Sequence, residues 1–285
     1  MTRAALCVAA LGALAACEVP LDPIAPSDLY FSMSGYLDAS SDTQWVRVEP
    51  LAPTADPRPD PLDAAVTLTD VASGAAVPLT QEVRPLRTGP AHLFWTTADV
   101  ALGGRYRLAA RRADGAVTAA DVVVPADGSF EVEVVTGRNT CPTTVTVSGA
   151  ERVVDVQARY VLQRGGRRAE YRYSHAGTFV TLDDGSVRAS VYYADDASRM
   201  GLDPLVDPAQ AGIVESSLVV AVSTAAWPDL AGLTLEDALL VESFGVENGL
   251  GFVGGAVTER HPYVPGIISL GFGAAFLPCT RDSAS

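Results

Sequence analysis

The chain contains no lysine. All 20 of its basic residues are arginines, against 34 aspartates and glutamates, and its formal net charge is −14. Without a lysine amine, a Schiff-base enzyme and a P-loop are both excluded. The acidic balance argues against a nucleic-acid partner, because phosphate binding needs clustered cationic side chains. With 285 residues, 48% of them hydrophobic, the chain is nevertheless long enough for one large or two ordinary domains with hydrophobic cores.

Histidine is also rare, and the few histidines are isolated. His92, His175 and His261 have no second metal ligand two, three or four residues away, so the sequence gives no support to a zinc site. The G-x-S-x-G and S-x-x-K patterns of serine nucleophiles are absent. We therefore expect no metal, no cofactor and no catalytic residue of these kinds.

One glycine-rich segment has the G-x-G-x-x-G order of a dinucleotide-binding loop, with glycines at positions 249, 251 and 254. Such a site needs a helix directly after the loop, and Pro262 follows too soon for one. The glycines instead predict a tight turn or a β-bulge.

Long apolar runs are missing except at the start of the chain. A short positive beginning, Met1-Thr2-Arg3, precedes an apolar run over residues 4–14, which has the form of a secretory signal peptide over residues 1–16. The run ends in Leu14-Ala15-Ala16-Cys17, which resembles the bacterial lipobox. The sequence therefore predicts cleavage before Cys17 and acylation of its sulfur and new amine. The alternative is an ordinary signal peptide that ends near a cysteine.

Cysteine is scarce, and its positions suggest one bond. Cys7 is lost with the signal peptide and Cys17 carries the lipid, which leaves Cys141 and Cys279 as a pair in an oxidising compartment. A Cys141–Cys279 disulfide is the prediction, and two free buried thiols are the alternative.

Short alternating segments with turn residues between them fill the rest of the chain. Three prolines over residues 17–28 indicate an extended tether. Residues 29–37 and 44–49 flank a turn-rich stretch and predict a β-hairpin. Evenly spaced strands continue to residue 136, so an all-β sandwich is expected over residues 29–136.

A second β-rich domain is expected over residues 137–285, with at most two short helices. The helix candidates are Asp203–Gly212 and Trp227–Leu240, because each has a proline near its start and acidic residues in its first turn. Strands are expected over 187–193, 239–245 and 267–276, among others.

Carboxylates are the plentiful reactive groups. Asp183-Asp184-Gly185 and Asp195-Asp196 follow successive predicted strands, but neither has the D-x-D-x-D-G spacing of a calcium loop. Solvated turns capped by aspartate hydrogen bonds are the simpler interpretation. A glycosidase would need two facing carboxylates, which the sequence does not locate.

Aromatic side chains offer one candidate binding surface. Tyr171 and Tyr173 share one side of a predicted strand, and with Arg172 they are candidates for a face that stacks on a glycan or peptide. Tyr192 and Tyr193 lie on a neighbouring segment and must point to opposite sides. Packing of these rings in the core is the alternative.

The order of these elements resembles a family of outer-membrane lipoproteins of Bacteroidota-type bacteria, the domain of unknown function 4249, often encoded beside outer-membrane transporters. The lipobox and five later segments carry the resemblance: Phe31–Leu37 with Val46–Val48, Ala64–Asp70, Gly104–Leu108, Ala119–Pro125 and Glu247–Gly255. The resemblance implies an immunoglobulin-like or carboxypeptidase-regulatory-like first sandwich and supplies no catalytic residue.

Two functions follow from the sequence. The first is a non-enzymatic accessory or binding lipoprotein, held at the outer membrane by its lipid, with an outer-membrane transporter or another envelope protein as its partner. Glu18 after the acylated cysteine differs from the aspartate that retains lipoproteins at the inner membrane. The second is a glycan-active hydrolase with paired carboxylates in the second domain.

Overall fold

The computed structural model describes residues 29–51, 60–86, 89–126, 129–136, 142–204, 206–228 and 245–265. Strands dominate these ranges, and their helical content is the 3-10 turn η1 (Ala176–Thr178) and the helix α2 (Tyr193–Arg199). The predicted all-β class is therefore confirmed. Within the same ranges no helix has the length and hydropathy needed to cross a bilayer.

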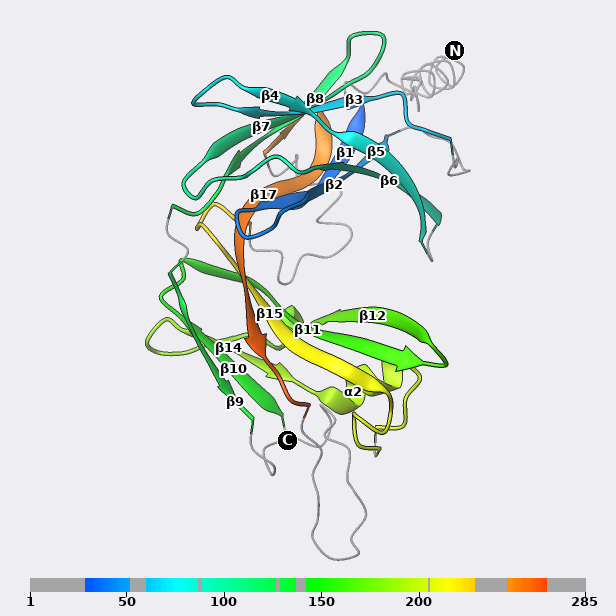
Figure 1. The fold of residues 1–285 in the computed structure, drawn as a ribbon. Helices are drawn as coiled ribbons and strands as arrows, with labels where there is room; N and C mark the ends of the chain where they lie inside the picture. Colours follow the sequence, from blue (N-terminus) through cyan, green and yellow to red (C-terminus); the bar gives the residue numbers. More distant parts are fainter. Residues whose placement is uncertain are drawn as a thin grey trace, which may run out of the picture.

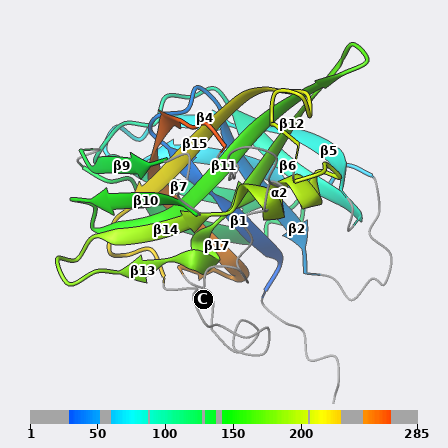
Figure 2. The same ribbon diagram turned by 90° about the horizontal axis from the view of Figure 1, so that it is seen from below.

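The described strands form three sheets. The largest has eight strands in the order β12 (Arg167–Ser174), β11 (Arg152–Arg164), β15 (Ile213–Ser223), β17 (Gly249–Pro262), β1 (Phe31–Asp38), β2 (Gln44–Pro50), β6 (Gly89–Thr96) and β5 (Thr80–Leu86). The second has five, in the order β16 (Val246–Glu247), β8 (Val117–Val123), β7 (Arg105–Arg111), β3 (Ala65–Asp70) and β4 (Ala76–Pro78). The third has four, in the order β13 (Val180–Thr181), β14 (Val187–Val191), β10 (Thr143–Ser148) and β9 (Glu131–Val135), and Figure 2 shows them side by side.

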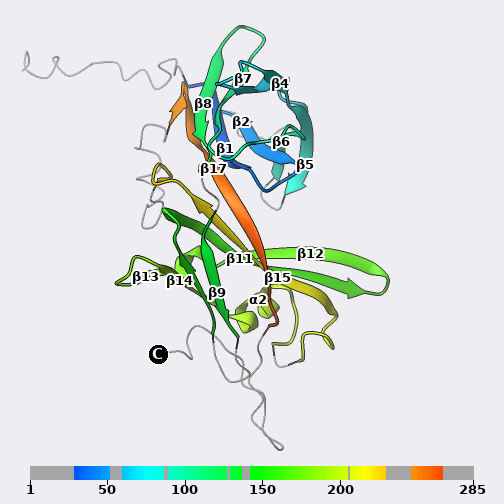
Figure 3. The same cartoon turned by 60° about the vertical axis from the view of Figure 1, so that its left-hand side comes forward.

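The long strand β17 joins the two halves of the molecule. Its first part pairs in parallel with β1, from Phe31 opposite Gly249 to Asp38 opposite Ala256. Its last part pairs antiparallel with β15, from Val222 opposite Val257 to Ser217 opposite Pro262. Figures 1 and 3 show β17 running from the half that contains β1 to the half that contains β15. The eight-stranded sheet is therefore shared by both halves.

The first core lies between this sheet and the five-stranded sheet. Residues alternate along β1 and β2, so that Phe31 and Met33 face the core together with Val46 and Val48. Leu108 of β7 meets them from the opposite sheet, as do other buried side chains of β3 and β8. This alternation of buried and open positions is what a strand with one covered face requires.

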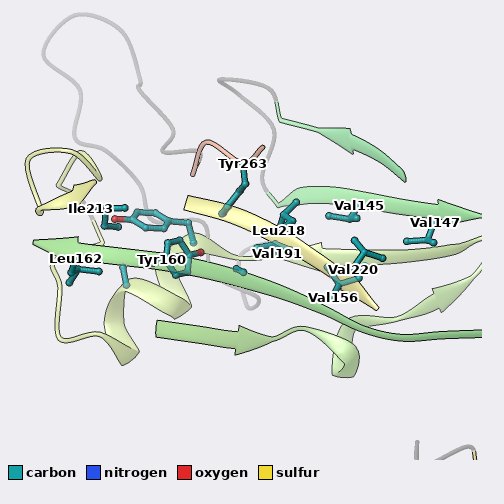
Figure 4. Close-up of a cluster of buried hydrophobic side chains, with 14 of the residues drawn as sticks. Val145, Val147, Val156, Tyr160, Leu162, Val191, Ile213, Leu218, Val220 and Tyr263 are labelled. Carbon is teal, nitrogen blue, oxygen red and sulfur yellow. The ribbon is translucent and has the colours of Figure 1, made fainter. Parts of the chain in front are cut away.

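The second core lies between the other end of the shared sheet and the four-stranded sheet. Tyr160 of β11 and Leu218 of β15 pack there with Val145 of β10 and Val191 of β14 (Figure 4). Tyr160 is fully buried and contacts three further tyrosine rings, with centroids 6.1 to 6.3 Å from its own. The helix α2 adds Tyr193 and Ala197 to this core.

Both cores draw side chains from both sides of residue 136, where the sequence divides the two domains. Phe130, before that position, belongs to the second core, and β9 pairs with β10. Val246 and Val253, far beyond it, belong to the first core. The chain thus leaves the first half after β8 and returns to it with β16 and β17.

Three local predictions are corrected. The glycine-rich segment has its expected turn at Asn248, but from Gly249 it forms the start of the 14-residue strand β17, which was not expected. Residues 203–212 form turns in their described part, although a helix was expected. Conversely, α2 begins at Tyr193, where a strand was expected to end. The predicted leader 1–16, the tether 17–28, residues 229–240 of the second helix candidate, and the segments 239–244 and 267–276 lie outside the described residues.

Candidate functional site

The face of the shared sheet that points away from both cores is the candidate site. Alternate residues of its central strands lie on this face, among them Tyr36 of β1, Thr258 of β17, Val219 of β15 and Gln157 of β11. Each has at least one neighbour along its strand in a core: Leu37, Val257, Leu218, Val220, Val156 and Ala158. We call this surface the outer face of the shared sheet.

Aromatic side chains form a row across the outer face. Tyr36 lies directly opposite Trp45 in the pairing of β1 with β2, and Trp45 lies opposite Trp95 in the pairing of β2 with β6. The Trp45 and Trp95 ring centroids are 5.9 Å apart. On the other side of Tyr36, the Trp227 ring lies 6.4 Å from Tyr36 and 4.8 Å from Phe252. These five side chains, the aromatic band, include all three tryptophans of the chain.

The middle of this band separates two hollows. One has a volume of about 520 Å³ and is lined largely by apolar groups, including Trp227, Phe179 and Val153. The other has a volume of about 650 Å³ and is more polar, with Ser41 and Thr43 among its lining residues. Tyr36 lines both hollows and is 39% exposed, so a ligand that fills both must lie against its ring.

Two carboxylates beside the band are held by hydrogen bonds. One oxygen of Asp38 accepts the backbone N–H of Thr258 at 3.2 Å and that of Ser40 at 2.9 Å, and the other accepts the Thr258 hydroxyl at 2.6 Å. Asp155 accepts the Ser174 hydroxyl at 2.6 Å and the side-chain amide of Gln157 at 2.7 Å. These bonds fix the carboxylates as rigid parts of the rim.

The charges around Tyr36 act on its hydroxyl. Burial raises the pKa of Tyr36, the charge of Asp38 raises it further, and Arg172 opposes them. The Arg172 guanidinium is itself oriented by Glu170, whose Oε1 lies 2.8 Å from Nε. Between Tyr36 and Trp95 in the band, the Trp45 ring has the Arg84 guanidinium 4.4 Å from its centre, a cation–π geometry.

A glycine allows the Trp227 ring to pack directly on the sheet. A Cβ atom at Gly254 would collide with Cζ3 of Trp227 and would lie 2.6 Å from its Cε3 atom. Gly254 is opposite Tyr36 in the pairing of β1 with β17. The absence of a side chain at position 254 thus lets the tryptophan lie on the backbone beside Tyr36.

A second polar cluster lies inside the second core. Asp196 is fully buried, and its Oδ2 accepts the Tyr160 hydroxyl at 2.9 Å and lies 3.1 Å from Nε2 of His175. Nη1 of Arg199 lies 3.9 Å from the other oxygen. Burial and nearby charges raise the pKa of Tyr160, and burial raises the pKa of Tyr193 to about 12. Because Asp196 has no exposed surface, this cluster stabilises the core and offers no surface to a substrate.

The residues predicted as a stacking face divide between two sides of β12. Tyr171 and Tyr173 are half-buried against the second core, and Arg199 lies 5.5 Å from the centre of the Tyr173 ring. Arg172 lies on the outer face and lines the polar hollow. Tyr192 and Tyr193 are both buried. The structure therefore brings one of the three predicted ligand-binding residues, Arg172, to the aromatic band.

The remaining predicted sites are dispersed. Asp184 caps its own turn by accepting the backbone N–H and the hydroxyl of Ser186, as the turn interpretation predicts. Nδ1 of His92 lies 2.8 Å from Oε2 of Glu49, and the other histidines are far away in the sequence. In the described part of the chain, no group of three potential metal ligands occurs. The lipidation site Cys17 and the disulfide candidates Cys141 and Cys279 lie outside the described residues.

Sequence reasoning missed the aromatic band itself. Its centre could have been found, because the predicted hairpin over residues 29–49 places Tyr36 and Trp45 on one face, opposite to Leu37 and Val46. Trp95 follows from the same alternation once β6 is paired with β2. The position of Trp227 depends on β17, which the sequence did not predict as a strand.

No protein-family model matches this chain, and neither does any curated protein. Among solved structures, the pullulanase from Anoxybacillus sp. LM18-11, crystallised with and without maltotriose, is similar over 68% of this chain and 24% of its own. The identity is 14%, with TM-scores of 0.24 and 0.23. A tetra-tandem repeat from the extending region of a large adhesion protein is similar over 82% of this chain and 48% of its own, with 14% identity and a TM-score of 0.21. This chain thus spans about a quarter of the pullulanase and about half of the adhesin fragment.

Proposed function

We propose that the protein is a lipid-anchored, non-enzymatic binding protein of the bacterial cell envelope, and that its ligand lies on the outer face of the shared sheet. The observation that carries the binding role is the aromatic band. Tyrosine and tryptophan, with arginine, are the side chains that contribute most to binding when they gather on an open surface. Four of the five rings of the band are tyrosine or tryptophan, and they lie beside two hollows on a surface that covers no core.

The membrane location rests on the lipobox at Leu14–Cys17. Each buried CH₂ of an acyl chain contributes about 0.8 kcal/mol to membrane binding, so two or three chains hold a protein stably without a spanning helix. The proline-containing segment 17–28 would then separate the anchor from β1. The outer membrane is the proposed location, with a transporter or another envelope protein as a neighbour, as the family resemblance implies.

The arrangement of carboxylates favours binding over hydrolysis. Glycoside hydrolysis needs one carboxyl group free to give a proton and a second free to attack or to activate water. Asp38 and Asp155, two of the three carboxylates that line the hollows, each accept hydrogen bonds on both oxygens. The Asp196 carboxylate is fully buried. The hydrolase remains the alternative hypothesis.

The anchor is tested by replacing Cys17 in the full-length chain. We expect wild-type protein expressed in a Gram-negative host to fractionate with membranes, and mass spectrometry to find an acylated Cys17 at its N-terminus. Cys17→Ala should remove the acylation and release the protein from the membrane fraction. Cys7→Ala is the matched control, since that cysteine lies within the cleaved segment, and it should behave as wild type. An unmodified mature chain that begins at another residue would contradict the anchor.

A further inference from the structure

We infer that the ligand of the aromatic band is an uncharged sugar chain that lies across the strands of the shared sheet. The inference deepens the proposed binding function and rests on it. Four properties of the outer face support this ligand class: the row of rings, the pairing of the strands beneath them, the balance of charge around them and the ordered polar groups beside them.

The rings of the band form a row across the strands, the platform, in which the measured neighbouring rings are tilted by 36° to 73°. Tyr36, Trp45 and Trp95 occupy directly opposed positions on three successive strands, and neighbouring strands are ~4.8 Å apart. Within the row, the Trp45 and Trp95 ring centroids are 5.9 Å apart. The apolar C–H face of a sugar ring packs well on an aromatic ring, while its hydroxyls remain free at the edges. Trp227 and Phe252 continue the platform beyond Tyr36.

The strands under the platform are unsuited to an extended peptide. A peptide commonly binds a sheet by adding a strand to an open edge, where backbone groups are unpaired. The strands that carry Tyr36, Trp45 and Trp95 each have a paired strand on both sides, in the order β17-β1-β2-β6-β5. Their backbone groups are already used within the sheet. The face therefore offers side chains alone, which suits a ligand recognised through its surface and its hydroxyl groups.

The charge around the platform is balanced. The two hollows are lined by three arginines, Arg152, Arg172 and Arg260, and by three acids, Asp38, Asp155 and Glu259. An acidic polysaccharide would meet as many carboxylates as guanidinium groups. A neutral ligand encounters no net repulsion, and such a site can reject charged competitors.

The polar groups beside the rings suit hydroxyl recognition. The side-chain amide of Gln157 donates a hydrogen bond to Asp155 at 2.7 Å, and the Ser174 hydroxyl donates another. These side chains are therefore ordered before a ligand binds. Arg172 is likewise oriented by Glu170. Ordered side chains with both donor and acceptor groups lose little freedom on binding and match the paired hydroxyls of a sugar ring.

The test uses full-length protein in detergent micelles. It is first applied to an array of neutral and acidic glycans, and the best neutral oligosaccharide is then titrated by calorimetry. We expect binding to at least one neutral linear glycan. Tyr36→Ala should weaken that binding at least ~10-fold because the central ring is lost, whereas Tyr36→Phe should stay within ~3-fold of wild type.

Tyr171→Ala is the matched control, since it removes the same side chain from the opposite side of the shared sheet. It should leave the affinity unchanged while circular dichroism confirms the fold of all variants. Binding confined to acidic glycans or to a proline-rich peptide probe, or no binding to any glycan on the array, overturns the sugar-chain inference and leaves the proposed binding function standing. New reducing ends after incubation with the bound glycan would instead overturn the non-enzymatic function.

Discussion

At the scale of single residues, Asp196 shows how a buried charge is accommodated in a small core. Its carboxylate has no exposed surface, and the Tyr160 hydroxyl and the His175 ring are its close partners. Removing one partner of a buried carboxylate costs more than the net value of the hydrogen bond, because the remaining charge is left less solvated. The cluster therefore contributes to the stability of the second half.

We expect Tyr160→Phe to lower the free energy of unfolding by about 1–3 kcal/mol, because Asp196 loses its hydroxyl donor while the ring packing is kept. Urea denaturation of both proteins measures the difference. Tyr171→Phe serves as the comparison, since its ring is half-buried at the edge of the same core, and its effect should stay below about 0.5 kcal/mol. Equal stability of Tyr160→Phe and wild type would show that the hydroxyl does not support the carboxylate.

Tyr193 makes a separate prediction at alkaline pH. Burial raises its pKa from 10.0 to about 12, and the charge of Asp207 adds to this effect. The folded state thus holds the proton more tightly than the unfolded state. Titration of this group therefore leaves stability unchanged below pH 10 and lowers it as the pH rises from 10 toward 12, where the unfolded state loses the proton and the folded state keeps it. Tyr193→Phe should flatten this part of the stability profile.

At neutral pH, Tyr193→Phe should be as stable as wild type or more stable, because the Tyr193 hydroxyl is buried without a hydrogen-bond partner among the described residues. Tyrosinate absorbance and unfolding followed from pH 8 to 12 check both points. An unchanged alkaline profile in the variant would mean that other groups cause the loss of stability.

At the scale of elements, β17 determines both the fold and the site, and it was the hardest element to predict. Strands are recognised by an alternation of apolar residues, and four glycines interrupt this alternation in β17: Gly249, Gly251, Gly254 and Gly255. A Cβ atom at Gly255 would collide with the Val123 backbone, and one at Gly251 with the Met33 backbone. These glycines are required by contacts with distant parts of the chain, and a local sequence pattern does not reveal such contacts.

Gly254→Ala tests whether the Trp227 ring packs on the backbone at position 254. The added methyl group would overlap the indole, so the ring must leave its position beside Tyr36. We expect a loss of about 1–3 kcal/mol in stability and greater quenching of tryptophan fluorescence by acrylamide. Gly177→Ala is the matched control, because it lines the same hollow and an added Cβ meets no atom within 4 Å. Unchanged quenching in Gly254→Ala would contradict the seating of the ring.

Other elements show where local patterns succeed. The hairpin of β1 and β2 was predicted nearly to the residue, because polar and apolar side chains alternate on both sides of a turn-rich stretch. The helix α2 was missed because it is seven residues long and directly follows a strand. Its signals were Asp195 and Asp196 in the first turn and Arg199 in the last, a charge order that favours a helix.

At the scale of the whole molecule, one sheet supports two cores. The late strands β16 and β17 return to the first half, and Phe130, which precedes residue 136, belongs to the second core. The two halves therefore share β17 and meet along the outer face, where Tyr36 lines both hollows. Short-range alternation predicted the all-β class, but it contains no information about which distant strands pair. The candidate site arises from that pairing.

The most direct test of the account follows from the position of the tryptophans. Because Trp45, Trp95 and Trp227 all lie on the aromatic band, 5-fluorotryptophan incorporated into the full-length protein places every fluorine reporter at the proposed site. Fluorine NMR during titration with the neutral oligosaccharide selected on the array should show the tryptophan signals shifting in proportion to occupancy, with the oligosaccharide recovered intact. Signals that stay unchanged when the protein is saturated would place the ligand elsewhere and contradict the account.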